Sequence, residues 1–446
     1  MKFNPEEYSH FIFANWQASF EQGNLELTFS YQLQSEKSED LSFNEKLIYP
    51  NIQDLDLAQP AIKQAINFLH LVLGVSYYKA SVASKISCPK IKLDSDLADF
   101  LNKTYFNGLQ EFSYVNKLDI RDRINFETSA SVRQPVADSQ LAEQVIIPMG
   151  GGKDSLLVLE ILKAQNPLLL TLGINSTVRE IANYYQLPVI EVQRKIDPLL
   201  LELNERGAYN GHVPFSAILG AVLGVAAFCY DARYLALANE RSANQGNTEF
   251  LGNIVNHQYS KTFEFERDLN NIFKKSIHGS LEYFSLLRPF SEIKIASEVA
   301  SQQDLVELFS SCNANKKIKQ DFTGKWCATC PKCCFVFLCF APYVDKNQLM
   351  SVFGKNLLNE PSLLESYSQL CGLSSIKPLE CVGEFEESAS LIQELSKKSD
   401  FAEDLVVQEL AVQLPHDTRD LDHFMDLSDE HLIPEKIFKY INDYLS

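Results

Sequence analysis

One short stretch of this sequence combines glycines with charged and hydroxyl side chains in an order that could bind a phosphate. The stretch is Gly150-Gly151-Gly152-Lys153-Asp154-Ser155, and it follows the apolar residues 145–149. Consecutive glycines after a strand let backbone N–H groups converge on an anion, and a helix that starts directly afterwards adds its positive N-terminal end. The sequence therefore predicts a phosphate-binding loop over residues 150–155.

This loop differs from two common phosphate-binding motifs. A Walker A loop needs Gly-x-x-x-x-Gly-Lys followed by Ser or Thr, whereas Gly152-Lys153 is followed by Asp154 and lacks the upstream glycine. The Gly-x-Gly-x-x-Gly spacing of dinucleotide-binding folds is also missing. The segment instead resembles the Ser-Gly-Gly-x-Asp-Ser loop of the PP-loop ATP pyrophosphatases, with Gly150 in place of the leading serine.

The resemblance implies that the loop binds ATP in an enzyme that splits it into AMP and pyrophosphate. It also implies that Asp154 helps to hold Mg²⁺ on the phosphates and that Lys153 offsets negative charge. A glycine-rich turn without a ligand is the alternative, because an Asp-Ser pair at the start of a helix is also a good cap.

A second group of residues with the potential for chemistry is a set of four cysteines. Cys312 is followed by Cys327, Cys330 and Cys333, the last three at the spacing Cys-x-x-Cys-x-x-Cys. Short turns of this kind bring thiolates to one centre, and four sulfurs suit a closed tetrahedral Zn²⁺ site with a structural role. An iron–sulfur cluster is the alternative, and Cys334 is an alternative fourth ligand to Cys333.

These residues need a scaffold, and the apolar pattern from residue 145 on predicts strands that alternate with helices. The expected strands are 145–149, 168–172, 189–192 and 234–238, and the expected helices are 156–164, 177–185 and 216–230. The alternation predicts an α/β fold with a doubly wound parallel sheet of the PP-loop type over residues 141–342. Sites in such sheets gather at the carboxyl ends of the strands.

Two segments of different character flank this domain. Residues 1–140 combine an alternating strand at 25–33 with a helix between Pro60 and Gly74 and a second helix over 97–115. Residues 343–446 lack strand-like alternation and predict short amphipathic helices. We therefore expect an N-terminal α+β domain, a central domain with the loop and the four cysteines, and a mainly helical C-terminal extension.

The overall composition limits the class of protein. The 446 residues include 40 basic and 58 acidic side chains, and the net charge of −18 disfavours broad binding to nucleic acid or to an anionic membrane. The first residues lack the pattern of a secretory signal, so we expect a cytoplasmic protein whose ten cysteines are thiols or metal ligands. The apolar run 215–230 is shorter than the roughly 20 residues of a membrane-spanning helix, and we interpret it as a buried helix.

Features outside the loop point to a more specific family. A PP-loop followed by this cysteine pattern resembles the 7-cyano-7-deazaguanine synthases, which activate a carboxylate by adenylylation. The extra segments at both ends favour a different family, because six short segments in this order resemble the UDP-N-acetylmuramoyl-L-alanyl-L-glutamate epimerases of bacterial peptidoglycan synthesis. They are residues 74–79, 209–214, 239–242, 255–258, 310–313 and 380–384.

This second resemblance implies an enzyme that uses ATP and Mg²⁺ to invert the terminal L-glutamate of UDP-MurNAc-L-Ala-L-Glu to D-glutamate. The implied route is adenylylation of the α-carboxylate, removal and return of the α-proton, and hydrolysis that leaves AMP. The alternatives are an adenylylating ligase like the deazaguanine synthases and a zinc-stabilised nucleotide sensor that holds ATP without using it.

Three residues are candidates for the proton transfer. His212 and His257 belong to the residue type whose ordinary pKa near 6.5 suits proton transfer, with a structural or substrate-binding role as the alternative. Glu240 follows the fourth expected strand. Basic side chains could bind a phosphate or carboxylate of the substrate, with a surface salt bridge as their alternative role. They are Arg241, Lys261 and Arg288.

Overall fold

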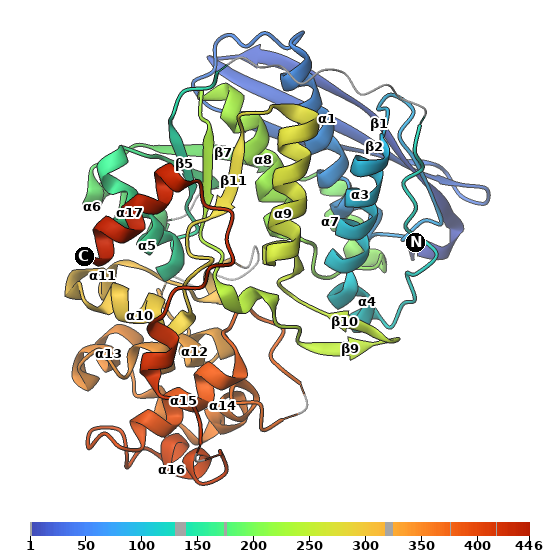
Figure 1. Cartoon of the computed structure of the whole chain (residues 1–446). Coiled ribbons are helices and arrows are strands. Elements are labelled where there is room, and N and C mark those ends of the chain that lie inside the picture. The colour runs from blue at the N-terminus through green and yellow to red at the C-terminus, as the bar shows by residue number, and fades with distance from the viewer. Residues whose placement is uncertain (1, 130–139, 174–175, 317–323, 375, 416) are drawn as a thin grey trace.

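Nine strands of the described residues form one sheet, and helices cover it (Figure 1). The computed structural model describes residues 2–129, 140–173, 176–316, 324–374, 376–415 and 417–446. The strands are β1 (Tyr8–Glu21), β2 (Asn24–Ser35), β3 (Leu41–Tyr49), β4 (Lys85–Ser87), β5 (Val145–Pro148), β6 (Leu168–Leu172), β7 (Val189–Lys195), β8 (Tyr234–Leu237), β9 (Thr248–Phe250), β10 (Asn253–Val255) and β11 (Glu282–Ser285). The sheet order is β11-β8-β5-β6-β7-β3-β2-β1-β4, and β9 and β10 form a separate hairpin.

The helices fall into three groups along the chain. In the N-terminal segment they are α1 (Pro60–Leu73), α2 (Val75–Tyr78), α3 (Ser95–Gly108) and α4 (Gln110–Asn116). Between the parallel strands and beyond them lie α5 (Lys153–Leu162), α6 (Ser176–Tyr185), α7 (Pro198–Arg206), α8 (Phe215–Cys229), α9 (Phe263–Ile272), α10 (Glu292–Ala300), α11 (Gln303–Leu308) and α12 (Pro331–Phe340). The last group is α13 (Lys346–Phe353), α14 (Leu364–Leu370), α15 (Phe385–Leu395), α16 (Leu405–Ala411) and α17 (Glu435–Leu445).

The parallel part of the sheet has the order β7-β6-β5-β8-β11, so the strand order reverses between β5 and β8. Doubly wound sheets have this order, and they bind ligands where it reverses. The four strands and three helices predicted for this region are all present, with ends that differ by at most three residues. The fifth parallel strand, β11, was not predicted, because its two aromatic residues lie between Glu282 and Ser285 and form no apolar run like those of β5 and β8.

Alternate side chains of the parallel strands enter two different hydrophobic cores. Ile146 and Leu235 belong to one core together with residues of α1, α8 and α9. Val145 and Ala236 belong to the other, together with residues of α5, α10 and α12. Burial of both faces explains why these strands are continuously apolar. The apolar run 215–230 forms α8, which packs against α1 in the core, as predicted.

Membrane-spanning helices are not found in the described part of the chain, where every helix is too short or too polar to cross a bilayer. The described elements from residue 343 on are all helical, which agrees with the predicted mainly helical C-terminal region. Figure 1 shows α13 to α16 gathered below the sheet, whereas α17 returns beside α5.

The antiparallel strands of the N-terminal segment continue the parallel sheet. β3 pairs with β7, so the sheet crosses the domain boundary that we predicted at residue 140. A buried ion pair joins the same two strands, because Arg194 Nε on β7 lies 2.5 Å from the carboxylate of Glu45 on β3. Arg194 also donates to Ser76 Oγ at 2.9 Å. The three-domain division stays a prediction, and residues 130–139 beside its first boundary lie outside the described residues.

The single helix predicted over residues 97–115 is wrong, since the structure has two helices there. α3 ends at Gly108, and α4 begins at Gln110. Between them Leu109 leaves the helical region, with φ −102° and ψ 9°. Gly108 packs against Pro214 so closely that a Cβ at this position would lie 2.7 Å from the proline ring. This contact places α4 beside the segment that precedes α8.

Replacing Arg194 with alanine should lower the free energy of unfolding by about 3–5 kcal/mol, because Glu45 would stay buried without its cation. Denaturant unfolding of both proteins measures this difference. The matched control is Arg179→Ala, which removes an ion pair to Glu191 whose side chains are 53% and 28% exposed. That change should cost less than about 1 kcal/mol. Equal losses for the two variants would contradict a special role for the buried pair.

Candidate functional site

The predicted phosphate loop connects β5 to α5 at the point where the strand order reverses. Gly151 has a φ of +79°, in the left-handed region that favours glycine. A Cβ at Gly150 would meet no atom within 4 Å, so the serine of the loop that this segment resembles would fit here. Gly152 precedes α5 without a side-chain cap, so the helix directs N-terminal backbone N–H groups at the loop. This geometry fits a bound anion.

The two charged residues of the loop have different surroundings. Lys153 is fully buried and forms ion pairs with Asp154 and with Glu292 on α10. The side chain of Asp154 is 25% exposed. Burial alone would raise the pKa of Asp154, but the charges of Lys153 and Lys332 hold it below its usual value. An ionised and accessible carboxylate beside an anion-binding loop is suited to hold Mg²⁺ on phosphates.

The four predicted metal-binding cysteines lie together, with all four sulfur atoms within 4.8 Å of one another. The Cys333 sulfur lies 3.7 Å from that of Cys327 and 3.5 Å from that of Cys330. Four sulfurs about 2.3 Å from a central Zn²⁺ lie about 3.8 Å apart in a tetrahedron, so the cluster fits this ion. The fourth member is Cys312, and Cys334 is buried outside the cluster. All ten cysteines are described, and none forms a disulfide.

The cysteine cluster is connected to the phosphate loop through the residues that precede Cys312. The backbone N–H of Ser310 donates to the carbonyl oxygen of Gly151 at 2.9 Å. The hydroxyl of Ser311 accepts a hydrogen bond from the backbone N–H of Lys153 at 3.4 Å. The segment 310–313, part of the family resemblance, therefore joins Cys312 of the cysteine cluster to the loop.

A second connection leads from the cysteine cluster to the segment 380–384. Lys332 lies between two cluster cysteines at the start of α12, and its backbone N–H donates to the carboxylate of Glu380 at 2.8 Å. The ammonium group of Lys332 donates to the carbonyl oxygen of Cys381. The cluster therefore fixes the position of Cys381 as well as that of the loop.

Cys381 is the centre of a group of titratable side chains that the sequence analysis found only in part. Its sulfur accepts a hydrogen bond from Lys261 Nζ at 3.2 Å, and His257 lies close enough to lower its pKa. The Nδ1 atom of His257 in turn hydrogen-bonds Glu111, and the Nδ1 atom of His212 lies 3.7 Å from the same carboxylate. The centroids of the two imidazole rings are 4.4 Å apart. We call these five residues the Cys381 cluster.

The surroundings give members of the Cys381 cluster different charges. Burial alone would raise the pKa of Cys381, but the charge of Lys261 and the hydrogen bond with His257 lower it to about 5. Burial alone would lower the pKa of His257, but the hydrogen bonds with Cys381 and Glu111 raise it to about 9. Burial and the charge of His257 lower the pKa of His212 to about 4. At neutral pH the cluster therefore contains a thiolate, an imidazolium and a neutral imidazole.

Three members of this cluster could also approach a metal ion. Glu111, His212 and His257 place one ligand atom each within 4.8 Å of one another. The same side chains also contact one another directly, since Glu111 hydrogen-bonds the Nδ1 atom of His257 and approaches that of His212. We therefore interpret the group as a hydrogen-bonded acid–base cluster.

Charge interactions connect the Cys381 cluster with the phosphate loop and with Glu240. Burial alone would lower the pKa of Lys261, but the charges of Cys381, Glu240 and Asp154 raise it above its usual value. The charge of Lys332 acts on Asp154 and on Cys381. Glu240 is buried directly after β8, and Asp154 follows β5. The charges of Lys261 and Lys332 therefore lower the pKa of both the Asp154 carboxylate and the Cys381 thiol.

The three predicted substrate-binding cations differ in their contacts. Arg288 is 1% exposed, forms an ion pair with Glu266 at 2.8 Å, and donates to the carbonyl oxygens of Glu240 and Lys261 at 2.7 and 2.5 Å. These contacts favour a positioning role for Arg288. Lys261 contacts Cys381, as described. Within the described residues, the half-buried side chain of Arg241 makes no hydrogen bond or ion pair, so its guanidinium is available to an anion.

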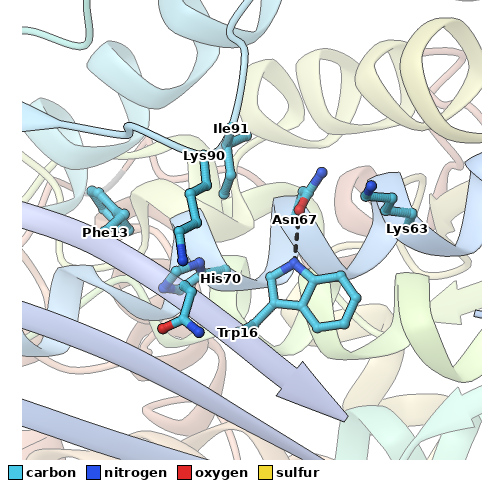
Figure 2. Close-up of a pocket in the computed structure, with 8 residues that line it drawn as sticks. Phe13, Trp16, Lys63, Asn67, His70, Lys90 and Ile91 are labelled. Carbon is cyan, nitrogen blue, oxygen red and sulfur yellow. Dashed lines mark hydrogen bonds between the residues drawn. The ribbon is translucent and has the colours of Figure 1, made fainter.

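A separate pocket lies in the N-terminal part of the molecule (Figure 2). It encloses about 240 Å³ and is lined by residues of β1, α1 and the segment after β4. The Trp16 indole nitrogen is directed at Asn67, with 2.8 Å between the nitrogen and the amide oxygen. None of the predicted site residues lines this pocket, so it is distinct from the loop and from the Cys381 cluster.

The strand order, the glycine-rich loop at the reversal and the four-cysteine cluster define an α/β protein with a cysteine cluster that could bind a metal ion. The chain belongs to the MurL family. Its residues 2–286 match the model of the MurL N-terminal domain, and its residues 308–424 match that of the MurL C-terminal domain. No solved structure matches the chain.

Curated relatives cover most of the chain. A protein of Xanthomonas oryzae pv. oryzae is 34% identical over 388 residues, which are 85% of this chain and 86% of the relative. A protein of Salinispora tropica is 33% identical over 402 residues, which are 89% of this chain and 87% of the relative. A Micromonospora protein is 32% identical over 81% of each chain. All three are named UDP-N-acetyl-alpha-D-muramoyl-L-alanyl-L-glutamate epimerase.

Metal analysis of the purified protein should find zinc bound at one site per chain, and Cys327→Ser should lose it. Because structural zinc contributes directly to folding, the variant should also have a lower thermal midpoint. Cys334→Ala is the matched control, because it changes a buried cysteine outside the cluster and should keep the metal. Iron in place of zinc, or unchanged zinc in Cys327→Ser, would contradict the assignment.

Proposed function

We propose that this protein is an ATP- and Mg²⁺-dependent epimerase that converts the terminal L-glutamate of UDP-MurNAc-L-Ala-L-Glu to D-glutamate in the synthesis of peptidoglycan precursors. Membership of the MurL family and the names of the three curated relatives support the substrate. The observation that carries the mechanism is that Lys261 and Lys332 connect the loop carboxylate Asp154 with the acid–base cluster. ATP and nucleotide-linked sugars are cytoplasmic metabolites, so we expect the reaction in the cytoplasm.

Activation by ATP explains why a phosphate loop belongs in an epimerase. The α-proton of a free glutamate lies beside an ionised carboxylate, so its removal would place a second negative charge next to the first. Attack of this carboxylate on the α-phosphorus of ATP gives an acyl-adenylate and pyrophosphate. The neutral carbonyl can then accept the electron pair of the C–H bond as an enolate. Protonation on the opposite face and hydrolysis of the acyl–phosphate bond release UDP-MurNAc-L-Ala-D-Glu and AMP.

The loop residues 150–155 have distinct roles in this scheme. The backbone N–H groups of the loop and the start of α5 hold phosphate oxygens of ATP. Asp154 would hold Mg²⁺, which neutralises charge on the departing pyrophosphate when it is bound. Lys153 keeps Asp154 ionised and in place through their buried ion pair. Ser155 Oγ donates to the carbonyl oxygen of Gly152 at 3.1 Å, which stabilises the turn.

The Cys381 cluster supplies the groups for proton transfer. His257 is the proton donor of the pair of histidines, because the hydrogen bonds with Cys381 and Glu111 outweigh burial and raise its pKa to about 9. His212 stays neutral beside it and can accept a hydrogen bond or a proton. The charge of Glu240 helps to raise the pKa of Lys261. The neighbouring Arg241 can bind the γ-carboxylate or a phosphate of the substrate through its guanidinium.

Purified protein incubated with ATP, Mg²⁺ and UDP-MurNAc-L-Ala-L-Glu should form UDP-MurNAc-L-Ala-D-Glu, AMP and pyrophosphate. Chiral analysis of the hydrolysed product measures the inversion, and a reaction in D₂O should place deuterium on the α-carbon of the product. Omission of ATP serves as the control, because the unactivated carboxylate should not exchange its α-proton. Formation of AMP without any D-glutamate would contradict the proposed reaction.

Replacing Asp154 with asparagine should reduce the rate of pyrophosphate release by at least about 100-fold, because the amide removes the negative charge that would hold Mg²⁺ on the phosphates. Release of pyrophosphate with saturating substrate measures the effect. Asp122→Asn is a matched control on an exposed carboxylate remote in sequence from the loop, and it should keep the original rate. A full rate in Asp154→Asn would show that the loop assignment is wrong.

A further inference from the structure

The proposed roles of the loop and the histidines leave the surroundings of Cys381 unexplained. Its sulfur contacts the Lys261 ammonium at 3.2 Å and lies close to His257, which Glu111 holds in place. The half-buried Cys88 is different, since burial raises the pKa of its thiol to about 12. A thiol within reach of a histidine that a third group orients is the arrangement of a reactive cysteine.

We propose that Cys381 is a catalytic residue of the epimerisation: its thiolate removes the α-proton of the activated glutamate from one face, and His257 delivers a proton to the opposite face. This inference rests on the proposed epimerase function. The two groups come from separate segments, His257 from the stretch after β10 and Cys381 from the stretch between α14 and α15. The α-carbon of the substrate enters between them.

The bond changes of this step are balanced. The thiolate sulfur forms an S–H bond with the α-proton, and the electron pair of the broken C–H bond moves into the enolate of the acyl-adenylate. The enolate pair then forms the new C–H bond with the proton of the imidazolium. A thiol and a neutral imidazole remain. Proton transfer from Cys381 to His257 along their hydrogen bond restores the starting pair after the product has left.

Insertion of the substrate between the two groups makes each of them more reactive. In the free protein the hydrogen bond between Cys381 and His257 stabilises both the thiolate and the imidazolium. Separation of the pair removes this stabilisation, so the thiolate becomes a stronger base and the imidazolium a stronger acid. Before substrate binds, Cys381 and His257 therefore already have the charges that the reaction needs. Binding of the substrate between them then makes the Cys381 thiolate more basic.

Charged neighbours set the pH range in which Cys381 is a thiolate while His257 is protonated. Lys261, Lys332 and His257 face Cys381 and, against burial, lower its pKa to about 5. Glu111, Cys381 and the neighbouring imidazole of His212 face His257, whose pKa the first two raise to about 9 against burial. Epimerisation should therefore rise as the thiol ionises, fall as the imidazolium loses its proton, and have a plateau between these values.

The test compares Cys381→Ser with the wild-type protein in first-turnover pyrophosphate release, D-glutamate formation and α-deuteration in D₂O. Serine keeps the size of the side chain but is a far weaker acid than cysteine, so it provides no anion at neutral pH. We expect D-glutamate formation and α-deuteration to fall by at least about 100-fold while first-turnover pyrophosphate release changes less than about threefold. Cys88→Ser is the matched control and should leave all three measurements unchanged.

Several results would overturn the proposal. Unchanged D-glutamate formation in Cys381→Ser would exclude the thiolate from proton transfer. Loss of pyrophosphate release together with epimerisation would assign Cys381 to folding or to ATP binding instead. A mass increase on Cys381 in acid-quenched wild-type reactions, equal to the substrate minus water, would identify the sulfur as a nucleophile that forms a thioester.

The reactivity of the Cys381 thiol can be measured without the epimerase reaction, so it tests this inference independently of the proposed function. The alkylation rate of Cys381 by iodoacetamide, measured by peptide mass analysis across pH, should have a midpoint near 5, and His257→Gln should move the midpoint upward. A midpoint near the ordinary value of about 8.5 would overturn the proposal. A wild-type protein that forms no D-glutamate would instead contradict the epimerase function, while the alkylation profile would still report on the thiolate.

Discussion

The four-cysteine cluster is the constraint on which the geometry of the site depends, because it holds two segments that are far apart in the sequence. Cys312 directly follows Ser311, which contacts the phosphate loop. Lys332, between two other cluster cysteines, donates to the carbonyl oxygen of Cys381. A metal ion bound by the four sulfurs would fix the distance between the loop that we propose to activate the carboxylate and the thiol that we propose to act on the α-carbon. A structural metal can in this way determine the chemistry without touching the substrate.

Two buried ion pairs lie near the proposed site, and their placement indicates a positioning role. The pairs of Lys153 with Glu292 and of Arg288 with Glu266 are almost completely removed from solvent. Because the cost of removing two charges from water offsets much of their attraction, such pairs are weak contributors to stability. What they do provide is fixed geometry. Lys153 holds the loop carboxylate Asp154, and Arg288 holds the backbone on either side of the proposed substrate site.

The sequence predicted those strands and helices whose apolar residues follow a regular pattern, and those site residues that belong to a recognisable motif. The strands and helices around the loop and the four-cysteine set follow from local patterns, and the structure contains them. β11 has only two apolar residues between Glu282 and Ser285, and the continuation of the sheet through β3 and β7 depends on pairing between distant segments. Glu111 and Cys381 were missed because no spacing links them to the histidines. The segment 380–384 in the family resemblance was the available signal for Cys381.

The N-terminal segment pairs with the parallel sheet through β3 and contributes Glu111 to the Cys381 cluster. Glu111 comes from α4, and it is the carboxylate that orients His257 and approaches His212. Lys79, in the segment 74–79, hydrogen-bonds Asn210 close to His212 in the sequence. Without this segment His257 would lose a partner that keeps it protonated, since Glu111 helps to raise its pKa. In the proposed reaction the loop activates the carboxylate, but inversion at the α-carbon also needs an oriented proton donor, and the N-terminal elements support that donor.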